Sequence, residues 1–266
     1  MNDYNYTDER IHQLCQIITK VNRSLVPKKA DDSHTNLYFE SIEQIIYGRW
    51  FEQNDQRYIL GLNLDKFFIQ LLDYKKDVLK EFEVAGRTSK EIETEIINVF
   101  DSLQIPTKDL MQDLHFEIPA YPFIDDKWEK PVEAELKNWT ANRTLANEAS
   151  MLLLGLTQSE SEIRIWPHHF DTGIYFKVKK DLGIGFGLAM KDNMVKDAYY
   201  YMAAYPENYK IKYENLPKGE IWKWQLGEHW NGAILPLKSL EGMTREKKEN
   251  HLSDYMQSAS AWMLKQ

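Results

Sequence analysis

Residues 166–171 (Trp-Pro-His-His-Phe-Asp) hold the densest group of side chains in the sequence that are able to do chemistry. Imidazole and carboxylate groups together bind zinc, iron or manganese. A carboxylate can also orient an imidazole that acts as a general base. If residues 162–179 form one strand, His169 and Asp171 share a face, because strand side chains alternate. His169 and Asp171 are thus a candidate metal site, or a candidate general base together with the carboxylate that orients it. His168 is adjacent to His169 in the sequence. The alternative is one hydrogen-bonded core histidine next to a surface histidine.

A second polar pair, Glu228 and His229, follows Gly227 between two expected strands. Loops carried on a rigid scaffold are frequent sites of catalytic residues. We therefore expect that His229 is able to complete a site begun by the first group. The candidate catalytic residues are His168, His169, Asp171, Glu228 and His229, and the candidate metal ligands are His169 and Asp171.

Aromatic side chains offer a different kind of site. Tyr199 and Tyr201 fall on one face of an expected strand, and the strand at 183–190 alternates glycine with apolar residues. A nearly bare strand face accepts either a ligand or an aromatic ring such as Trp166. Apolar pockets with a few polar groups are typical small-molecule sites. The candidate ligand-binding residues are Trp166, Tyr175, Tyr199, Tyr201, Trp222 and Trp224. The alternative is an aromatic-rich core beneath the last helix.

Composition and motifs argue against several classes of partner and cofactor. The formal net charge is −8 and the basic residues are scattered, which argues against nucleic acid as a partner. Leu188 stands where a dinucleotide-binding loop needs its third glycine, so no nucleotide cofactor is expected and a divalent metal stays open. Cys15 is the only cysteine, which excludes an internal disulfide and a cysteine-based zinc site.

Hydrophobic periodicity predicts an α+β fold, with antiparallel sheet material in two halves that are each flanked by amphipathic helices. The expected division is an N-terminal half at 1–120, a proline-punctuated linker at 121–131 and a C-terminal half at 132–266, or one continuous domain. Helices are expected at 7–24, from Thr88 to about 103, at 131–154 and at 244–264. Strands are expected at 36–41, 44–51, 57–64, 113–118, 162–179, 183–190, 198–205, 221–226 and 232–237, with a hairpin over 67–84.

The amino terminus lacks the basic start and apolar run of a signal peptide, and the apolar run at 151–156 is too short to span a bilayer. We therefore expect a cytoplasmic protein that has no membrane partner and that is a monomer or a homodimer.

The second half also carries a set of motifs. They are Arg164 followed by the stretch 166–171, the glycine-alternating strand at 183–187, Tyr205-Pro206-Glu207, and Trp230-Asn231-Gly232-Ala233-Ile234-Leu235. In these motifs the chain resembles an uncharacterised family of bacterial proteins that carries only a domain-of-unknown-function label. The resemblance implies no particular activity or cofactor. It does favour a functional site at His168, His169 and Asp171.

Three functions follow from these patterns. The first is binding of a small molecule in an aromatic and histidine-lined pocket of the C-terminal half. The second is a metal-dependent, hydrolase-like activity that uses His169 and Asp171. The third is a protein-interaction module with exposed aromatic side chains.

Overall fold

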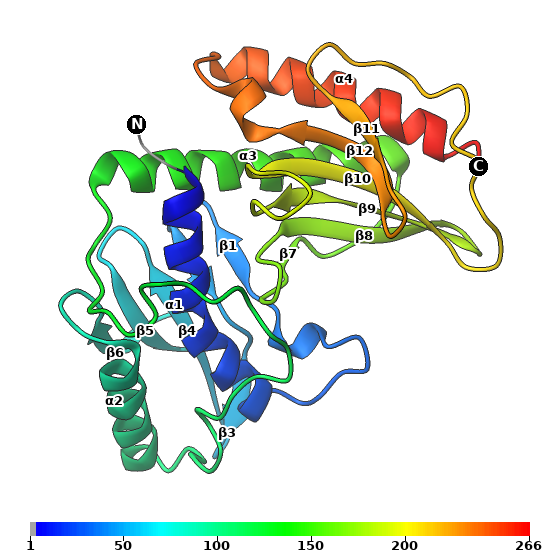
Figure 1. Cartoon of the computed structure of the whole chain (residues 1–266). Coiled ribbons are helices and arrows are strands. Elements are labelled where there is room, and N and C mark those ends of the chain that lie inside the picture. Colours follow the sequence, from blue (N-terminus) through cyan, green and yellow to red (C-terminus); the bar gives the residue numbers. More distant parts are fainter. Residues whose placement is uncertain (1–3) are drawn as a thin grey trace. The chain divides into compact units, whose positions relative to one another are not determined.

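The computed structural model describes residues 4–266 and divides the chain into two compact units (Figure 1). Unit 1 contains the chain up to Ala141 together with Ile165–Phe170, and unit 2 contains Asn142–Arg164 and Asp171–Gln266. The division therefore crosses a helix and a two-residue strand, and does not fall in the proline-punctuated segment 121–131. Trp139 shows why, because its indole N–H donates to Asp8 Oδ1 (2.7 Å) within unit 1.

Unit 1 is built on an antiparallel sheet in the order β1-β2-β4-β5-β6, with β3 paired to β4. The hairpin predicted over 67–84 is confirmed as β5 and β6. The elements of this unit are α1 (Tyr4–Leu25), η1 (Ser33–Thr35), β1 (Tyr38–Glu40), β2 (Ile45–Tyr47), β3 (Phe51–Gln53), β4 (Gln56–Asn63), β5 (Phe68–Asp73), β6 (Val78–Glu83) and α2 (Ser89–Ser102).

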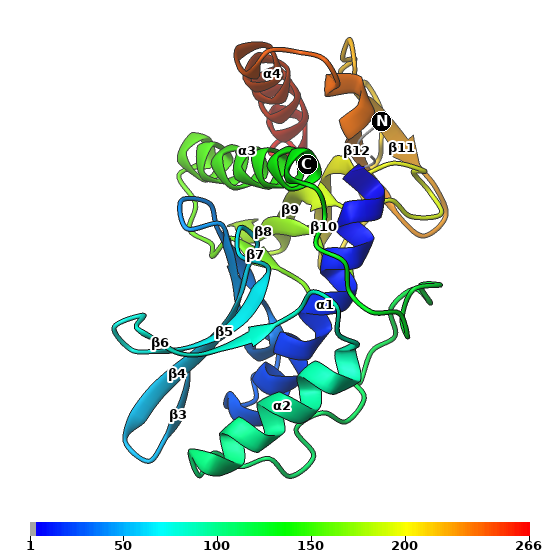
Figure 2. The same ribbon diagram turned by 90° about the vertical axis from the view of Figure 1, so that its left-hand side faces the viewer.

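Helices α1 and α2 lie on the same side of this sheet (Figure 2). The predicted capping box of α2 is confirmed, because the Thr88 hydroxyl accepts from Glu91 N–H and the Glu91 carboxylate accepts from Thr88 N–H. Each helix buries one apolar stripe, as an amphipathic helix does when it covers a sheet. The buried residues of the stripes include Ile11, Leu14, Cys15 and Ile18 of α1, and Ile92, Ile96 and Phe100 of α2.

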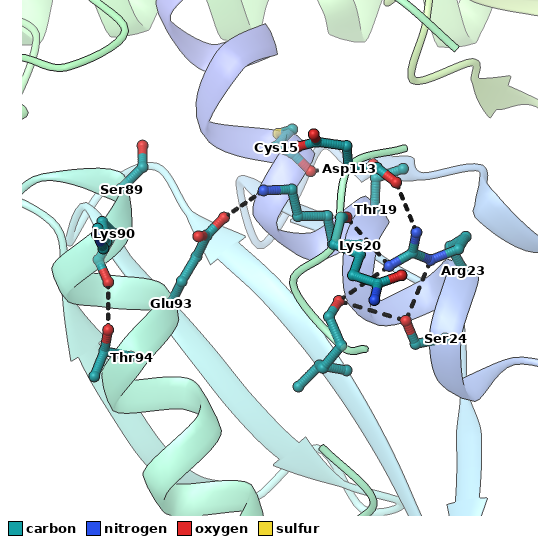
Figure 3. A network of polar contacts seen from close by, with 12 residues as sticks. Cys15, Thr19, Lys20, Arg23, Ser24, Ser89, Lys90, Glu93, Thr94 and Asp113 are labelled. Atoms are coloured by element: carbon teal, nitrogen blue, oxygen red, sulfur yellow. Dashed lines mark hydrogen bonds and ion pairs between the residues drawn. The ribbon is translucent and has the colours of Figure 1, made fainter. Parts of the chain in front are cut away.

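Polar side chains of α1 connect it to α2 and to the loop that follows α2 (Figure 3). Lys20 Nζ lies 2.7 Å from Glu93 Oε1. The Arg23 guanidinium donates to four carbonyl oxygens, those of Asp109, Leu110, Gln112 and Asp113. The strand predicted at 113–118 is wrong: this segment consists of bends and irregular backbone. The Asp113 carbonyl oxygen of this segment accepts from Arg23, and no strand of the described chain pairs with residues 113–118.

Unit 2 contains a second antiparallel sheet, with strands in the order β11-β12-β10-β9-β8. The α+β prediction with two antiparallel sheets is therefore confirmed. Its elements are β8 (Thr172–Lys179), β9 (Leu182–Ala189), β10 (Tyr199–Pro206), β11 (Lys223–Leu226), β12 (Asn231–Pro236), η2 (Leu237–Leu240) and α4 (Arg245–Met263). The unit boundary runs through α3 (Glu133–Thr157) and β7 (Arg164–Ile165).

Helix α4 covers one face of the unit 2 sheet. The Tyr255 hydroxyl donates to the Ala233 carbonyl oxygen of β12 (2.7 Å), and its ring lies 6.4 Å from the ring of Phe186 in β9. Thr244 caps the helix by accepting from Lys247 N–H. The other face of the sheet carries the glycines of β9 and the tyrosines Tyr199, Tyr201 and Tyr205 of β10, which side-chain alternation places opposite the face covered by α4. Across residues 4–266, each helix is too short or too polar to cross a bilayer.

Candidate functional site

The stretch that holds the paired histidines is a turn, so the single strand predicted at 162–179 is wrong. Strand β7 ends at Ile165, residues 167–169 form a turn, and β8 begins at Thr172. The amide N–H of Phe170 donates to the Trp166 carbonyl oxygen (2.6 Å), and Phe170 has a positive φ of 51°. His169 and Asp171 therefore do not share a strand face, and they belong to different units.

A buried histidine that the sequence analysis did not select holds this turn. His12 of α1 is fully buried, with Nε2 2.8 Å from the Pro167 carbonyl oxygen and Nδ1 2.8 Å from the Tyr121 hydroxyl. A carbonyl only accepts, so Nε2 carries the proton and Nδ1 accepts from the Tyr121 O–H. Gln16 Nε2 donates to the same Pro167 oxygen (2.9 Å). The available signal was a row of polar residues at helical spacing, Asp8, His12 and Gln16, beside the apolar stripe of α1.

The two predicted histidines lie on the outside of this turn. The His168 ring is half-buried and lies 5.5 Å from the Phe116 ring and 4.2 Å from the His169 ring, measured between centroids. His169 is exposed, and Trp166 is half-buried. Among residues 4–266, no group of three or more His, Cys, Asp or Glu side chains is arranged to hold a metal ion. The roles of His169 and Asp171 as metal ligands stay a prediction.

In unit 2, tyrosine rings cover the glycines of β9. Gly183, Gly185 and Gly187 face the side opposite α4, and a Cβ atom on any of them would meet neighbouring atoms at 3.0 Å or less. A Cβ atom on Gly183 would lie 2.2 Å from the Tyr175 hydroxyl oxygen, and one on Gly185 would lie 3.0 Å from the Tyr205 ring. The bare face expected from the sequence thus accepts aromatic rings, which come from neighbouring strands and not from Trp166.

We call this surface the tyrosine face, and it consists of Tyr175 of β8, Tyr199, Tyr201 and Tyr205 of β10, and Trp230 before β12. The Trp230 ring lies over Gly232, where a Cβ atom would be 2.5 Å from it, and it packs, together with Tyr201, against Tyr199 and Ile234. Tyr175 and Tyr205 remain 43% and 40% exposed. The face therefore presents ring surfaces to solvent.

A buried carboxylate, that of Asp171, belongs to the tyrosine face. The Tyr201 hydroxyl donates to Asp171 Oδ2 (2.6 Å), and Asp171 is only 8% exposed. Asp171 Oδ1 is buried and has no hydrogen-bond partner in the described chain. Burial, followed by the charge of Asp171 and this hydrogen bond, raises the pKa of Tyr201 well above its usual value, so Tyr201 is a neutral donor.

The aromatic residues predicted to line one pocket are divided between the two faces of the sheet. Register places Trp224 opposite Ala233, whereas Tyr201 pairs with Ile234, so the two side chains point in opposite directions. Trp222 lies beside α4, 5.4 Å from the Tyr255 ring, and donates to Asp254 Oδ2 (3.2 Å). The cross-strand register thus places Tyr199 and Tyr201 on one face of the sheet and Trp222 and Trp224 on the side of α4.

Glu228 and His229 are exposed in the connection between β11 and β12. Among the described residues, neither makes a hydrogen bond or ion pair with Asp171. Tyr199, in contrast, is buried and donates to Asp192 Oδ2 (2.7 Å). The structure thus groups Asp171 with tyrosines and not with the predicted loop pair.

Comparison with protein-family models, with curated proteins and with solved structures gives no match. The resemblance to an uncharacterised bacterial family stays a prediction.

Proposed function

We propose that unit 2 binds a small organic molecule on the tyrosine face. The observation that carries this proposal is the pair Tyr175 and Tyr205, whose rings lie over a glycine floor and keep about two fifths of their surface in solvent. Large apolar side chains that are positioned in this way and left uncovered favour a binding surface. Tyrosine suits such a surface, because it supplies contact area at a small cost in conformational entropy.

Polar groups next to the rings support the same proposal. Small-molecule sites combine apolar walls with a few fixed polar groups that orient the ligand. Here Asp171 is fixed by the Tyr201 hydroxyl, and the Tyr199 hydroxyl is fixed by Asp192. The tyrosine face therefore has walls and oriented polar groups on the same side of the sheet.

The metal-dependent, hydrolase-like alternative requires a further imidazole or carboxylate that would bind the metal together with His169 or Asp171. The protein-interaction alternative depends on how far the exposed aromatic surface extends. Both differ from the small-molecule proposal in the residues that they require, so substitutions separate them.

The test is a fragment library screened by ligand-observed NMR against the wild-type protein, with Tyr205→Leu as the test variant. Trp224→Phe is the matched control, because Trp224 is an aromatic residue on the opposite face of the same sheet. We expect fragments whose binding is lost in Tyr205→Leu and retained in Trp224→Phe. A library in which no fragment depends on Tyr205 or Tyr175 refutes the proposal. Fragment binding that is lost in His169→Ala would instead favour a site at the turn of residues 166–170, the histidine turn.

A further inference from the structure

The charge on the tyrosine face is unbalanced. Asp171 makes no ion pair with a lysine, arginine or histidine of the described chain, and its one hydrogen bond comes from the neutral Tyr201 hydroxyl. Lys177, the nearest basic residue along β8, is paired with Glu207. A carboxylate that is removed from water without a cation is costly, and a positive charge nearby lowers that cost.

The aromatic rings add to this negative potential. The face of a phenol or indole ring carries negative electrostatic potential and attracts cations, particularly when water is displaced. Tyr175 and Tyr205 lie 6.0 Å apart between ring centroids, with their planes inclined at 60°. Trp230 adds a third ring on the same side of the sheet, where it lies over Gly232. Inclined rings form a corner, which suits a compact, rounded group better than a flat one.

The accessibility of Asp171 distinguishes between kinds of cation. Asp171 Oδ1 has no exposed surface, so a ligand on the face does not reach it with an N–H group. Its charge nevertheless acts through space on the face, and it contributes to the raised pKa of Tyr199, Tyr201 and Tyr205, for which burial is the larger cause. The surface thus offers charge and ring contact, whereas Asp171 Oδ1 is out of reach and Oδ2 already accepts from the Tyr201 hydroxyl.

We propose that the ligand of the tyrosine face is a quaternary or N-methylated ammonium compound, held by the rings of Tyr175, Tyr205 and Trp230 and attracted by Asp171. This rests on the proposed function and names its ligand class. Methyl groups around the nitrogen contact the rings, and the delocalised positive charge needs no hydrogen-bond acceptor. A primary amine would lose hydration without gaining an acceptor from Asp171.

The experiment compares choline with 3,3-dimethylbutan-1-ol, its neutral analogue in which carbon replaces the quaternary nitrogen. Binding is followed by tryptophan fluorescence and by NMR, with ionic strength matched by sodium chloride because free salt screens the attraction. We expect choline to bind roughly fivefold more tightly than the alcohol, as about 1 kcal/mol of cation–π attraction implies.

Variants assign the binding to residues. Tyr205→Leu is expected to abolish choline binding, whereas Tyr209→Leu, which removes another exposed tyrosine of unit 2, leaves it unchanged. Asp171→Asn is expected to weaken choline binding severalfold and to leave the alcohol unaffected. Tyr201→Phe keeps the carboxylate and removes its hydrogen bond, so it should retain the preference for the cation. Circular dichroism of each variant confirms that it folds.

The outcomes separate the two proposals. Equal binding of choline and the alcohol, both lost in Tyr205→Leu, overturns the ammonium assignment and leaves small-molecule binding in place. Choline binding that survives Tyr205→Leu also overturns the assignment, because the cation then binds elsewhere. Failure of choline, of the alcohol and of the fragment library to involve Tyr205 overturns both proposals.

Discussion

Replacing His12 with leucine tests whether the histidine turn depends on a buried hydrogen-bond relay from α1. In the structure, Nδ1 accepts from Tyr121 and Nε2 donates to Pro167, and the ring stacks on Phe170 with centroids 5.0 Å apart. Leucine fills a similar volume without a polar atom. The substitution therefore removes the hydrogen bonds while keeping most of the packing.

The cost follows from the groups that leucine leaves behind. The Tyr121 hydroxyl, on a side chain that is 6% exposed, loses the acceptor of its proton, which costs about 1–3 kcal/mol. The Pro167 carbonyl keeps the hydrogen bond from Gln16, so its loss is smaller. Losing the stacking on Phe170 adds about 0.5–1 kcal/mol. We expect His12→Leu to lower the free energy of unfolding of unit 1 by about 2–4 kcal/mol.

Amide hydrogen exchange measures this in unit 1 by itself, because a two-unit chain need not unfold in one step. The informative amide is that of Phe170, which donates to the Trp166 carbonyl oxygen within the turn. His115→Leu is the matched control, since His115 is exposed and pairs only at the surface with Asp32. The control should change stability by less than about 1 kcal/mol.

A double-mutant cycle with Tyr121→Phe decides whether the relay is responsible. When both polar partners are replaced by apolar groups, no orphaned group remains, so the double variant should be more stable than the sum of the single losses by about 1–2 kcal/mol. Strict additivity of His12→Leu and Tyr121→Phe would refute the reasoning, because it would mean that the two residues act independently.

Three further changes test other parts of the structure. Gly187→Ala places a carbon 2.6 Å from the Thr172 carbonyl oxygen and should destabilise unit 2 by several kcal/mol in urea unfolding. Gly155→Ala in α3, where the added carbon meets open space, should instead stabilise unit 2 by about 0.5–1 kcal/mol. Equal effects of the two substitutions would show that backbone crowding is not the cause. Burial lowers the pKa of His34 below 6.5, so the unfolded chain takes up a proton first as the pH falls. The contribution of His34 to stability should be complete above pH 6.5 and decline as the pH falls toward the lower folded pKa. His34→Gln should reduce this decline, as measured by urea midpoints at several pH values. Glu93→Gln removes the ion pair with Lys20 and should lower the free energy of unfolding by about 1 kcal/mol at low salt. The difference should shrink in about 1 M NaCl, because salt screens the pair. A difference that does not depend on salt would contradict this expectation.

Several elements could be predicted because their signals are local. Thr88 and Glu91 are three residues apart and satisfy each other's backbone groups, so the start of α2 follows from the sequence. The hairpin of β5 and β6 follows from a polar turn between apolar runs. The glycine alternation of β9 likewise indicated a face without side chains, and only the source of the covering rings was missing.

The turn at 166–170 and the division of the aromatic residues could not be predicted in this way. The apolar and polar alternation around His169 is compatible with a strand, and the turn is stabilised by His12 and Gln16, which lie 155 and 151 residues from Pro167. The direction of Trp224 depends on its pairing with Ala233, since a shift of one residue would reverse it.

The sequence by itself determined the α+β class, the amphipathic helices and the strand faces, because periodicity and capping act over a few residues. Tertiary structure alone decided that Asp171 meets Tyr201, that Tyr175 and Tyr205 lie over the glycines of β9, and that Trp230 lies over Gly232. The physical reason is that cross-strand register and long-range hydrogen bonds select which of many equivalent polar and aromatic residues come together.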